Sequence, residues 1–461
     1  MFDKKIYIER RNRLKKLCKH GVIVLPGNQK SPRNYKGNDY NFDQDSNFLY
    51  YFGIDIPNLI GVIDIDKNKE YIFGTDYTLD DIVWMGEQKL LKSFAQDSGV
   101  ENFIELKEFD SFASSLLKEE KRILILPQYR GETILHLSKA FGLDPMRIND
   151  YASETLIKAV VDQRNIKSEL EIKEIENAVN ITREMHLEAM KVTKPGIKEY
   201  EVVAALEAVA AKHNATTSFF TIFTKNGQTL HNHFHGNTLK DGDSVILDCG
   251  ARNINGYCGD MTTSFPVNGK FSPRQKDIYS LLIEMFDTAE KMIKPGINYK
   301  DVHLEISRVL TKGMIKRGLM KGDVDKAVSA GAHAIFMPHG LGHMLGLDVH
   351  DMEGLGEDYV GYDKFPRDPQ FGLNALRLAR DLKPGFVFTV EPGIYFIPEL
   401  IKRWKTADKF TEFLNYDAIE TYCDFGGMRY EGDFLITETG ARRLGEKMPK
   451  YPQEIEEIMN K

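Results

Sequence analysis

The first third of the chain alternates short apolar runs with amphipathic segments. Val22–Pro26 and Ile60–Ile65 are apolar runs of strand length that end at turn-like sequence. Two longer segments, Tyr7–Lys19 and Thr78–Leu90, space their apolar residues as a helix does. Strands that alternate with helices predict an α/β layer domain, in which the sequence shows no glycine fingerprint of a phosphate-binding loop. Two further strands are predicted at Glu70–Gly74 and Ile123–Pro127.

A helix start marks the boundary of a second domain. Ser168 is followed three residues later by Glu171, which is the form of a capping box. Apolar residues then recur at helical spacing over Ile172–Met185, so a long helix is predicted from this point. We therefore predict an N-terminal domain over residues 1–165 and a second domain over residues 166–461.

The second domain contains internal echoes. The tetrapeptide Lys-Pro-Gly-Ile occurs twice, with its copies shifted by 100 residues. Residues 241–250 run through a turn, an apolar strand, Asp248 and a glycine, and residues 384–393 repeat that order with Glu391. An apolar strand rarely ends in an acid that has no partner. These echoes predict two halves of one duplicated domain whose carboxylates converge on a shared centre, with chance similarity of turn–strand units as the alternative.

Composition and charge narrow the class of protein. A chain of 461 residues suggests two or three domains, and 42% hydrophobic with 28% charged residues excludes a disordered or fibrous chain. The net charge of −7 argues against a general polyanion binder, so we expect no nucleic-acid partner. No apolar run approaches membrane-spanning length and the charged start lacks a signal-peptide core, so we expect a cytoplasmic protein without membrane contacts. The cysteines form no CxxC motif and are expected to be free thiols: Cys18, Cys249, Cys258 and Cys423.

Candidate metal ligands lie in apolar or glycine-rich parts of the sequence. They are Asp248, Asp260, His343, Glu391 and Glu431. If they meet, the four carboxylates repel one another unless cations compensate their charge, and two divalent ions would do so. A ligand set rich in oxygen with a single nitrogen favours ions of the manganese or zinc type over a thiolate zinc site.

Each of these residues alone has an ordinary structural explanation. Asp248 or Asp260 alone is more often a turn or capping residue, and an isolated histidine such as His343 is rarely a metal ligand. His339 and His343 are four residues apart, but the glycines between them argue against a zinc pair carried by a helix. Glu431 alone is typical of an acid at a strand edge. The hypothesis of a metal centre therefore rests on the set as a whole.

The ordered motifs resemble those of a known family. Over nearly its whole length, the chain resembles the pita-bread metallopeptidases aminopeptidase P and prolidase. The resemblance implies a non-catalytic α/β domain of creatinase and aminopeptidase P type at residues 1–165. It also implies an α+β pita-bread catalytic domain, duplicated about a pseudo-twofold axis, at residues 166–461. The N-terminal resemblance lies between Arg33 and Gly53. The catalytic resemblance rests on ILDCGA at 246–251, GDMTTSFPVNGKF at 259–271, HGLGHMLGLDVHD at 339–351, TVEPGIY at 389–395 and RYEGDFLIT at 429–437.

The resemblance implies a role for each candidate metal ligand. Asp248 matches the acid that binds one ion alone, and Asp260 and Glu431 match the two bridging carboxylates. His343 and Glu391 match the ligands of the other ion. Two divalent ions are therefore expected, with manganese favoured and zinc or cobalt as alternatives.

The resemblance also implies a set of catalytic residues. His231 matches a histidine that binds substrate and handles protons, and His339 and His350 match two further active-site histidines. Arg377 matches an arginine near the far end of the substrate. Glu391 or a histidine is expected to pass a proton to the leaving nitrogen.

The implied activity is that of a dinuclear metal-dependent Xaa-Pro aminopeptidase, which hydrolyses the N-terminal Xaa-Pro bond with a hydroxide that bridges the ions. The expected substrates are peptides with proline in second position, and the expected assembly is a homodimer or homotetramer. The stretches 353–374 and 396–425 look closer to prolidases, so a Xaa-Pro dipeptidase is the alternative. A non-enzymatic binding protein of the same fold is a third hypothesis, against which the filled ligand positions argue.

Overall fold

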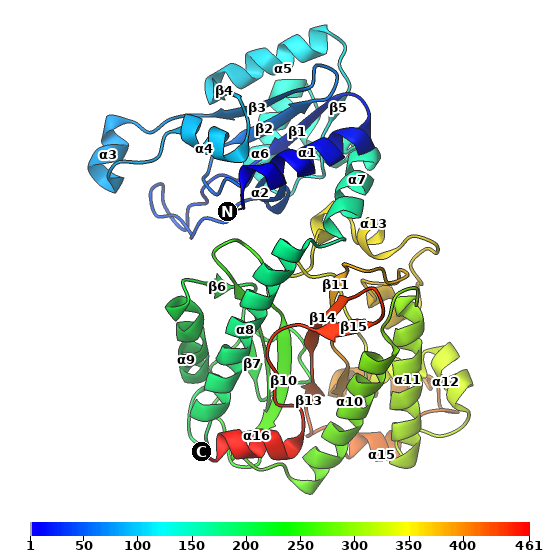
Figure 1. Cartoon of the computed structure of the whole chain (residues 1–461). Helices are drawn as coiled ribbons and strands as arrows, with labels where there is room; N and C mark the ends of the chain where they lie inside the picture. The colour runs from blue at the N-terminus through cyan, green and yellow to red at the C-terminus, as the bar shows by residue number, and fades with distance from the viewer. Residues whose placement is uncertain (1) are drawn as a thin grey trace. The chain divides into compact units, whose positions relative to one another are not determined.

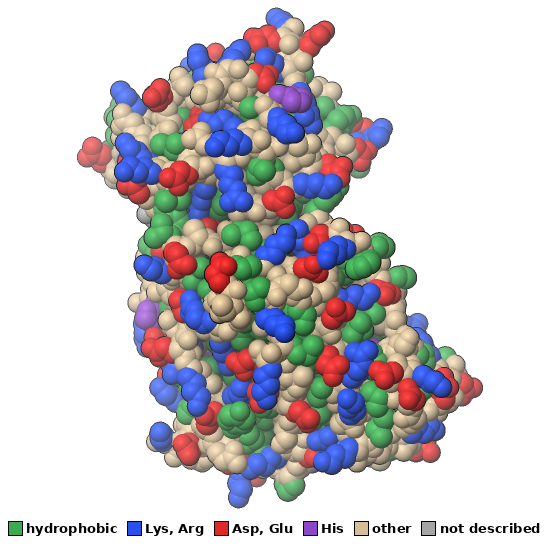
Figure 2. Space-filling view, turned by 45° about the vertical axis from the view of Figure 1, so that its right-hand side comes forward, with side chains coloured by type: hydrophobic (Ala, Val, Ile, Leu, Met, Phe, Trp, Pro, Cys, Tyr) green, Lys and Arg blue, Asp and Glu red, His purple; other side chains and the backbone are tan. Residues whose placement is uncertain are grey.

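The computed structural model describes residues 2–461, which separate into two compact units (Figure 1). The first unit runs to Arg164 and includes the segment Glu353–Tyr359. The second contains Asn165–Met352 and Val360–Lys461. On the face drawn in Figure 2, acidic and basic side chains are interspersed. Among the described residues, no helix combines the length and apolar character that a membrane crossing needs.

The first unit is built on one mixed sheet. Its strands are β1 (Val22–Pro26), β2 (Ile60–Asp64), β3 (Lys69–Gly74), β4 (Asn102–Glu105) and β5 (Ile123–Leu124). Its helices are α1 (Lys4–Cys18), α2 (Ser46–Phe52), α3 (Leu79–Met85), α4 (Leu91–Ser98), α5 (Phe109–Lys118), α6 (Gly131–Phe141) and α7 (Glu154–Arg164). The sheet order is β4-β3-β2-β1-β5, antiparallel in the middle and parallel at both edges. Parallel neighbours need crossover connections, which the helices supply, so the predicted α/β layer is confirmed.

Helix α3 departs from its predicted length. The apolar spacing predicts a helix over Thr78–Leu90, whereas α3 spans Leu79–Met85. The Thr78 side chain caps its start, and Gly86 ends it with a φ of +78°. Glycine adopts this left-handed conformation without the steric cost that other residues meet, so the helix stops there. Several apolar side chains of α3, including Trp84, are exposed.

The second unit packs long helices against short strands (Figure 1). Its helices are α8 (Glu169–Val192), α9 (Glu199–Lys212), α10 (Pro273–Met292), α11 (Tyr299–Lys316), α12 (Val324–Ala330), α14 (Pro398–Thr406), α15 (Tyr416–Glu420) and α16 (Pro452–Met459), while α13 (Glu357–Gly361) begins in the first unit. Its strands are β6 (Thr216–Thr217), β7 (Ile222–Thr224), β8 (Ser244–Cys249), β9 (Ala251–Arg252), β10 (Met261–Pro266), β11 (Val387–Val390), β12 (Gly393–Tyr395), β13 (Gly427–Arg429), β14 (Gly432–Ile436) and β15 (Ala441–Arg443). The predicted capping box at Ser168 opens α8.

The duplication predicted from the sequence echoes is present in this unit. In each copy, a Lys-Pro-Gly-Ile turn joins two helices, α8 to α9 and α10 to α11. The Gly196 N–H donates to the Leu239 carbonyl, and the Gly296 N–H donates to the Leu382 carbonyl, both at 2.8 Å. Each half then contributes a three-stranded sheet, ordered β10-β8-β7 and β11-β14-β15. Equivalent bonds at equivalent places confirm that the fold is built from two related halves.

Candidate metal centre

A cavity of about 270 Å³ in the second unit brings the predicted site residues together. The side chains that line it include every predicted ligand and catalytic residue: His231, Asp248, Asp260, His339, His343, His350, Arg377, Glu391 and Glu431. Apolar residues also contribute to its lining: Phe219, Phe220, Ile222 and Leu230. Residues more than 150 positions apart in the sequence, such as His231 and Glu391, therefore face one space.

Strand ends from both halves of the duplicated unit carry the candidate ligands. Asp248 lies near the end of β8, and Asp260 immediately precedes the paired strand β10. Glu391 follows β11, and Glu431 precedes the paired strand β14. The two halves are joined here because the Glu431 N–H donates to the Thr262 carbonyl at 2.9 Å. The structure thus places the two echoing acids, Asp248 and Glu391, at one cavity.

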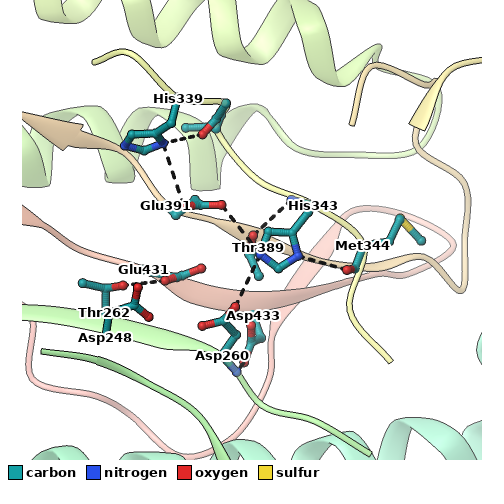
Figure 3. Close-up of polar contacts among 12 residues, drawn as sticks. Asp248, Asp260, Thr262, His339, His343, Met344, Thr389, Glu391, Glu431 and Asp433 are labelled. Carbon is teal, nitrogen blue, oxygen red and sulfur yellow. Dashed lines mark hydrogen bonds and ion pairs between the residues drawn. The ribbon is translucent and has the colours of Figure 1, made fainter. Parts of the chain in front are cut away.

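His343 turns one ring nitrogen toward the carboxylates (Figure 3). Its Nε2 lies 3.4 Å from Asp260 Oδ2 and 3.7 Å from Glu391 Oε1. Its Nδ1–H donates to the Met344 carbonyl at 3.0 Å, and this fixes the tautomer in which Nε2 carries a lone pair. Asp260, His343 and Glu431 each offer one ligand atom, and these atoms lie within 4.8 Å of one another. A single ion can reach all three.

The carboxylates of this cluster are buried beside one another. Burial, and then the charge of Asp248, raise the pKa of Asp260 well above its usual range. Burial, and then the charges of Asp260 and Glu391, raise the pKa of Glu431 in the same direction. Asp260 Oδ1 is buried and has no hydrogen-bond partner among the described residues. A bound cation relieves this combination of desolvation, repulsion and an unused oxygen, so the donor set fits divalent ions.

Arg429 is a buried residue of the site whose role the sequence analysis missed. Its Nη1 donates to the Tyr395 hydroxyl at 2.7 Å, its Nε donates to the Thr262 hydroxyl at 3.0 Å, and its Nη2 pairs with Asp248. The Thr262 hydroxyl in turn donates to Glu431 at 2.6 Å. The guanidinium therefore places a fixed positive charge beside the carboxylates. The sequence did contain one indication of this role. Arg429 and Glu431 are two residues apart, and residues at that spacing lie on the same face of an extended chain.

His339 is held by a chain of hydrogen bonds that begins at Arg429. The Tyr395 hydroxyl accepts from Arg429 and donates to His339 Nε2 at 3.0 Å. The Nδ1–H of His339 donates to the Gly340 carbonyl at 2.7 Å. Burial, and then the charge of Arg429, lower the pKa of His339 to about 3. This imidazole is therefore neutral and fixed in orientation.

His231 and His350 lie at the same cavity as the candidate ligands. Burial, and then the charge of Arg429, lower the pKa of His231, so its ring is neutral near pH 7. The rings of His350 and His343 meet edge to face with centroids 4.2 Å apart. Arg377 adds a guanidinium to the lining, and such a group binds a carboxylate through two parallel hydrogen bonds. The cavity therefore offers imidazoles next to the ligand cluster and, besides Arg429, the guanidinium of Arg377.

The cysteines beside the ligands take no part in the cavity lining that the described residues form. Cys249 and Cys258 are buried, and burial raises the pKa of both thiols. A thiol held in its protonated form is a poor nucleophile and a poor metal ligand. All four cysteines are free, as the sequence predicts.

Comparisons with known proteins match both parts of the chain. The profile described as metallopeptidase family M24 matches residues 173–438. The profile described as aminopeptidase P, N-terminal domain, matches residues 7–125.

Curated relatives and solved structures carry two related names. The chain is 31% identical to the Xaa-Pro dipeptidase of Homo sapiens, over 95% of this chain and 88% of the relative. It is 30% identical to the Xaa-Pro aminopeptidase of Escherichia coli strain K12, over 91% of this chain and 90% of the relative. A variant of Escherichia coli aminopeptidase P solved with substrate superposes with a TM-score of 0.82 at 27% identity, covering 100% of this chain and 99% of that one. The zinc-substituted form of that enzyme with product has a TM-score of 0.81 at 27% identity, with the same coverage.

Proposed function

The chain belongs to metallopeptidase family M24 and is a hydrolase that cleaves peptides, and from that premise we propose that it is a Xaa-Pro aminopeptidase. It removes the first residue of peptides whose second residue is proline. The observation that carries the proposal is the meeting of four carboxylates and one imidazole at a single cavity. Support for the substrate class comes from the relatives, whose names all specify a Xaa-Pro bond.

Two divalent ions are proposed for this cavity. Asp248 would bind one ion alone, Asp260 and Glu431 would bridge, and His343 and Glu391 would complete the second ion. Manganese is proposed, with zinc or cobalt as alternatives, because carboxylate and imidazole donors suit these ions. When bound, the ions would lower the pKa of a water to supply the nucleophile and would polarise the scissile carbonyl.

The chain's own side chains orient the substrate and move protons. Both His231, which is neutral, and His350 line the cavity, and one of them would donate to the oxyanion that develops on the scissile carbonyl. Glu391 lines the cavity and is the carboxyl that we propose to carry a proton to the leaving prolyl nitrogen. That nitrogen has no N–H in the substrate, so a shaped pocket must recognise the proline ring. His339, locked by Tyr395, provides a rigid part of the wall.

The two units have different proposed tasks. Every residue that lines the cavity belongs to the second unit, which supports a catalytic domain at 166–461 and a non-catalytic one at 1–165. A homodimer or homotetramer is the proposed assembly. In the first unit, Leu79, Val83 and Trp84 of α3 are 80%, 77% and 84% exposed, an apolar surface that a second copy would cover. A cytoplasmic location, and the lack of nucleic-acid and membrane partners, stay predictions.

A Xaa-Pro dipeptidase is the second candidate function. The observation in its favour is the likeness of residues 353–374 and 396–425 to prolidases. Arg377 in the cavity suits the proline carboxylate that a dipeptidase must bind, but its presence alone does not decide between the two activities. An aminopeptidase must instead leave that direction open for the continuing chain. Identities of 31% to the dipeptidase and 30% to the aminopeptidase do not separate the two.

The deciding experiment compares cleavage of Ala-Pro and Ala-Pro-Ala by the manganese-loaded protein. We expect release of alanine from the tripeptide. We also expect Arg377→Ala to lower kcat/KM about tenfold more for the dipeptide than for the tripeptide, the value of one hydrogen bond to a charged group. Cleavage of Ala-Pro with an intact tripeptide would establish the dipeptidase. Cleavage of neither peptide by a metal-loaded chain would reject both functions.

A further inference from the structure

A buried ion pair lies outside the cavity and has no part in the proposed chemistry. Lys167 Nζ lies 2.8 Å from Asp351 Oδ2, and the two side chains are 2% and 1% exposed. The partners are 184 residues apart in the sequence. Burying two charges costs desolvation energy that their attraction barely offsets, so such a pair is weak evidence for a gain in stability. The position of this ion pair in the fold indicates a role other than stability.

Asp351 shares a hydrogen-bond acceptor with the candidate metal ligand His343. The Met344 carbonyl accepts the Nδ1–H of His343 at 3.0 Å and also the backbone N–H of Asp351 at 2.9 Å (Figure 3 shows the first of these bonds). The first bond turns His343 Nε2 toward Asp260. The second bond attaches the loop that carries His350 to the same Met344 carbonyl. A displacement of Asp351 therefore moves the carbonyl that sets the orientation of His343.

Lys167 is fixed on its other side by the strand that supports His343. The Lys167 N–H donates to the Gly385 carbonyl at 2.9 Å, two residues before β11. Further along β11, Thr389 exchanges two hydrogen bonds with the His343 backbone, at 2.9 and 3.2 Å. Lys167 thus connects the start of β11 to Asp351, at the end of the loop that carries His343 and His350.

The Asp351 carboxylate lies close to the backbone of the loop at Gly346. A Cβ atom added at Gly346 would lie 2.6 Å from Asp351 Oδ2. Asp351 Oδ1 also accepts the N–H of Asp348 at 3.3 Å. The carboxylate is therefore packed against the backbone of this loop and paired with Lys167.

We propose that Lys167 is a positioning residue that orients His343 and His350 through Asp351. The inference rests on the proposed function in that His343 is taken to bind a metal ion and His350 to act on substrate. Partners that orient a metal-binding histidine typically change metal affinity or activity by about 10–100-fold when they are removed. Lys167 and Asp351 would act in this way without touching ion or peptide.

The test titrates the metal-free double variant Lys167→Met/Asp351→Asn with Co²⁺. The double change removes both charges of this pair together, so its melting temperature should stay closer to that of the wild type than when either partner is changed alone. We expect Co²⁺ to bind about 10–100-fold more weakly and its visible absorption bands to change, because His343 is no longer held. The matched control is Arg11→Met, which breaks a buried pair in the first unit and should leave both cobalt readouts unchanged.

A second variant keeps both charges. Gly346→Ala pushes on Asp351 without removing the ion pair, and we expect it to weaken Co²⁺ binding in the same direction. Wild-type Co²⁺ affinity and absorption in both variants would overturn the proposal. The cobalt readouts contain no peptide, so they are separate from a failure of the proposed function. That failure would appear as a cobalt-binding wild-type chain that cleaves no Xaa-Pro peptide.

Discussion

Buried charge is treated differently in two regions of this protein. In the first unit, the Arg11 guanidinium is enclosed and donates to Glu70 at 2.7 Å and to two backbone carbonyls at 2.8 and 2.9 Å. In the second unit, Asp260 and Glu431 are equally buried, yet their pKa values are raised and Asp260 Oδ1 lacks a partner among the described residues. The chain itself completes the first site, whereas the second needs charge from a ligand.

Removing Asp260, which we propose to bridge the two ions, has the largest expected effect in the second unit. We expect Asp260→Ala to lose at least one ion and to lower kcat/KM on the order of 10⁴-fold, because the remaining ligands no longer hold both ions. Metal analysis of the purified variant and Xaa-Pro peptide kinetics measure the two effects. Full occupancy together with normal turnover would remove Asp260 from the ligand set.

Changing the histidines of the cavity separates substrate handling from metal binding. His231→Ala and His350→Ala should each lower kcat/KM on the order of 10²–10⁴-fold, as expected for groups that donate protons or hydrogen bonds in the transition state. Neither is needed to complete the ligand set, so metal content should stay near that of the wild type. Loss of both ions in either variant would show that the histidine is itself a metal ligand.

The buried charge in the first unit is tested by a change at Arg11. Arg11→Met leaves the Tyr51 and Ser98 carbonyls without this donor and leaves Glu70 paired with Lys15 at 3.0 Å, and we expect the free energy of unfolding to fall by about 1–3 kcal/mol. Chemical denaturation measures this loss. The folded variant should keep wild-type metal content and kcat/KM, because all cavity residues lie in the second unit. A variant that stays fully stable but loses its metal would contradict the division between the two regions.

The pH dependence of stability should differ between metal-free and manganese-loaded protein, by a smaller amount than the effects above. Burial raises the pKa of Asp433, whose carboxylate accepts the Asp260 N–H, to about 8, and those of Asp260 and Glu431 are also raised. A raised carboxyl pKa stabilises the fold below about pH 4, the unfolded value, and this stabilisation is lost as pH rises through the folded pKa. The melting temperature of metal-free protein should therefore fall by several degrees between pH 5 and pH 8 relative to the manganese-loaded form.

Buried neutral histidines provide the internal control for this measurement. Burial lowers the pKa of His303 to about 3 and that of His333 to about 4. A lowered histidine pKa reduces stability as pH falls below about 6.5, the unfolded value, which is the opposite sense. Because neither ring is among the side chains that line the cavity, their effect should cancel in the difference between the two forms. An equal pH profile for both forms would contradict the assigned role of the carboxylates.

The sequence specified those parts of the fold that depend on local pattern. Strand β1 has its predicted ends, and the Ser168 capping box opens α8 as expected. The turn glycines of the Lys-Pro-Gly-Ile copies identified the duplication, because a repeated turn requires the same residues in both copies. Helix α3 and strand β5 are shorter than predicted, since Gly86 ends the helix and β5 pairs with β1 over only Ile123–Leu124.

The sequence motifs predicted the residues of the candidate site but not the contacts that these residues make. Carboxylates at the ends of apolar strands are conspicuous in a sequence, so Asp248 and Glu391 were identified together with the other candidate ligands. Arg429 was missed because its partners, Asp248 and Tyr395, lie on other strands. The pairing of Lys167 with Asp351 was equally inaccessible, because no local pattern connects residues that meet only through the tertiary fold.

The number of divalent ions bound per chain, measured by anomalous diffraction from crystals of the manganese-loaded protein, tests the proposed metal centre directly. We expect two neighbouring ions at the cavity, with Asp260 and Glu431 as ligands of both and His343 as a ligand of one. Activity on Ala-Pro-Ala should disappear with the ions on chelation and return with manganese. A chain that cleaves this peptide while the cavity holds no ion, or that binds its ions elsewhere, would rule out a catalytic metal centre at this cavity.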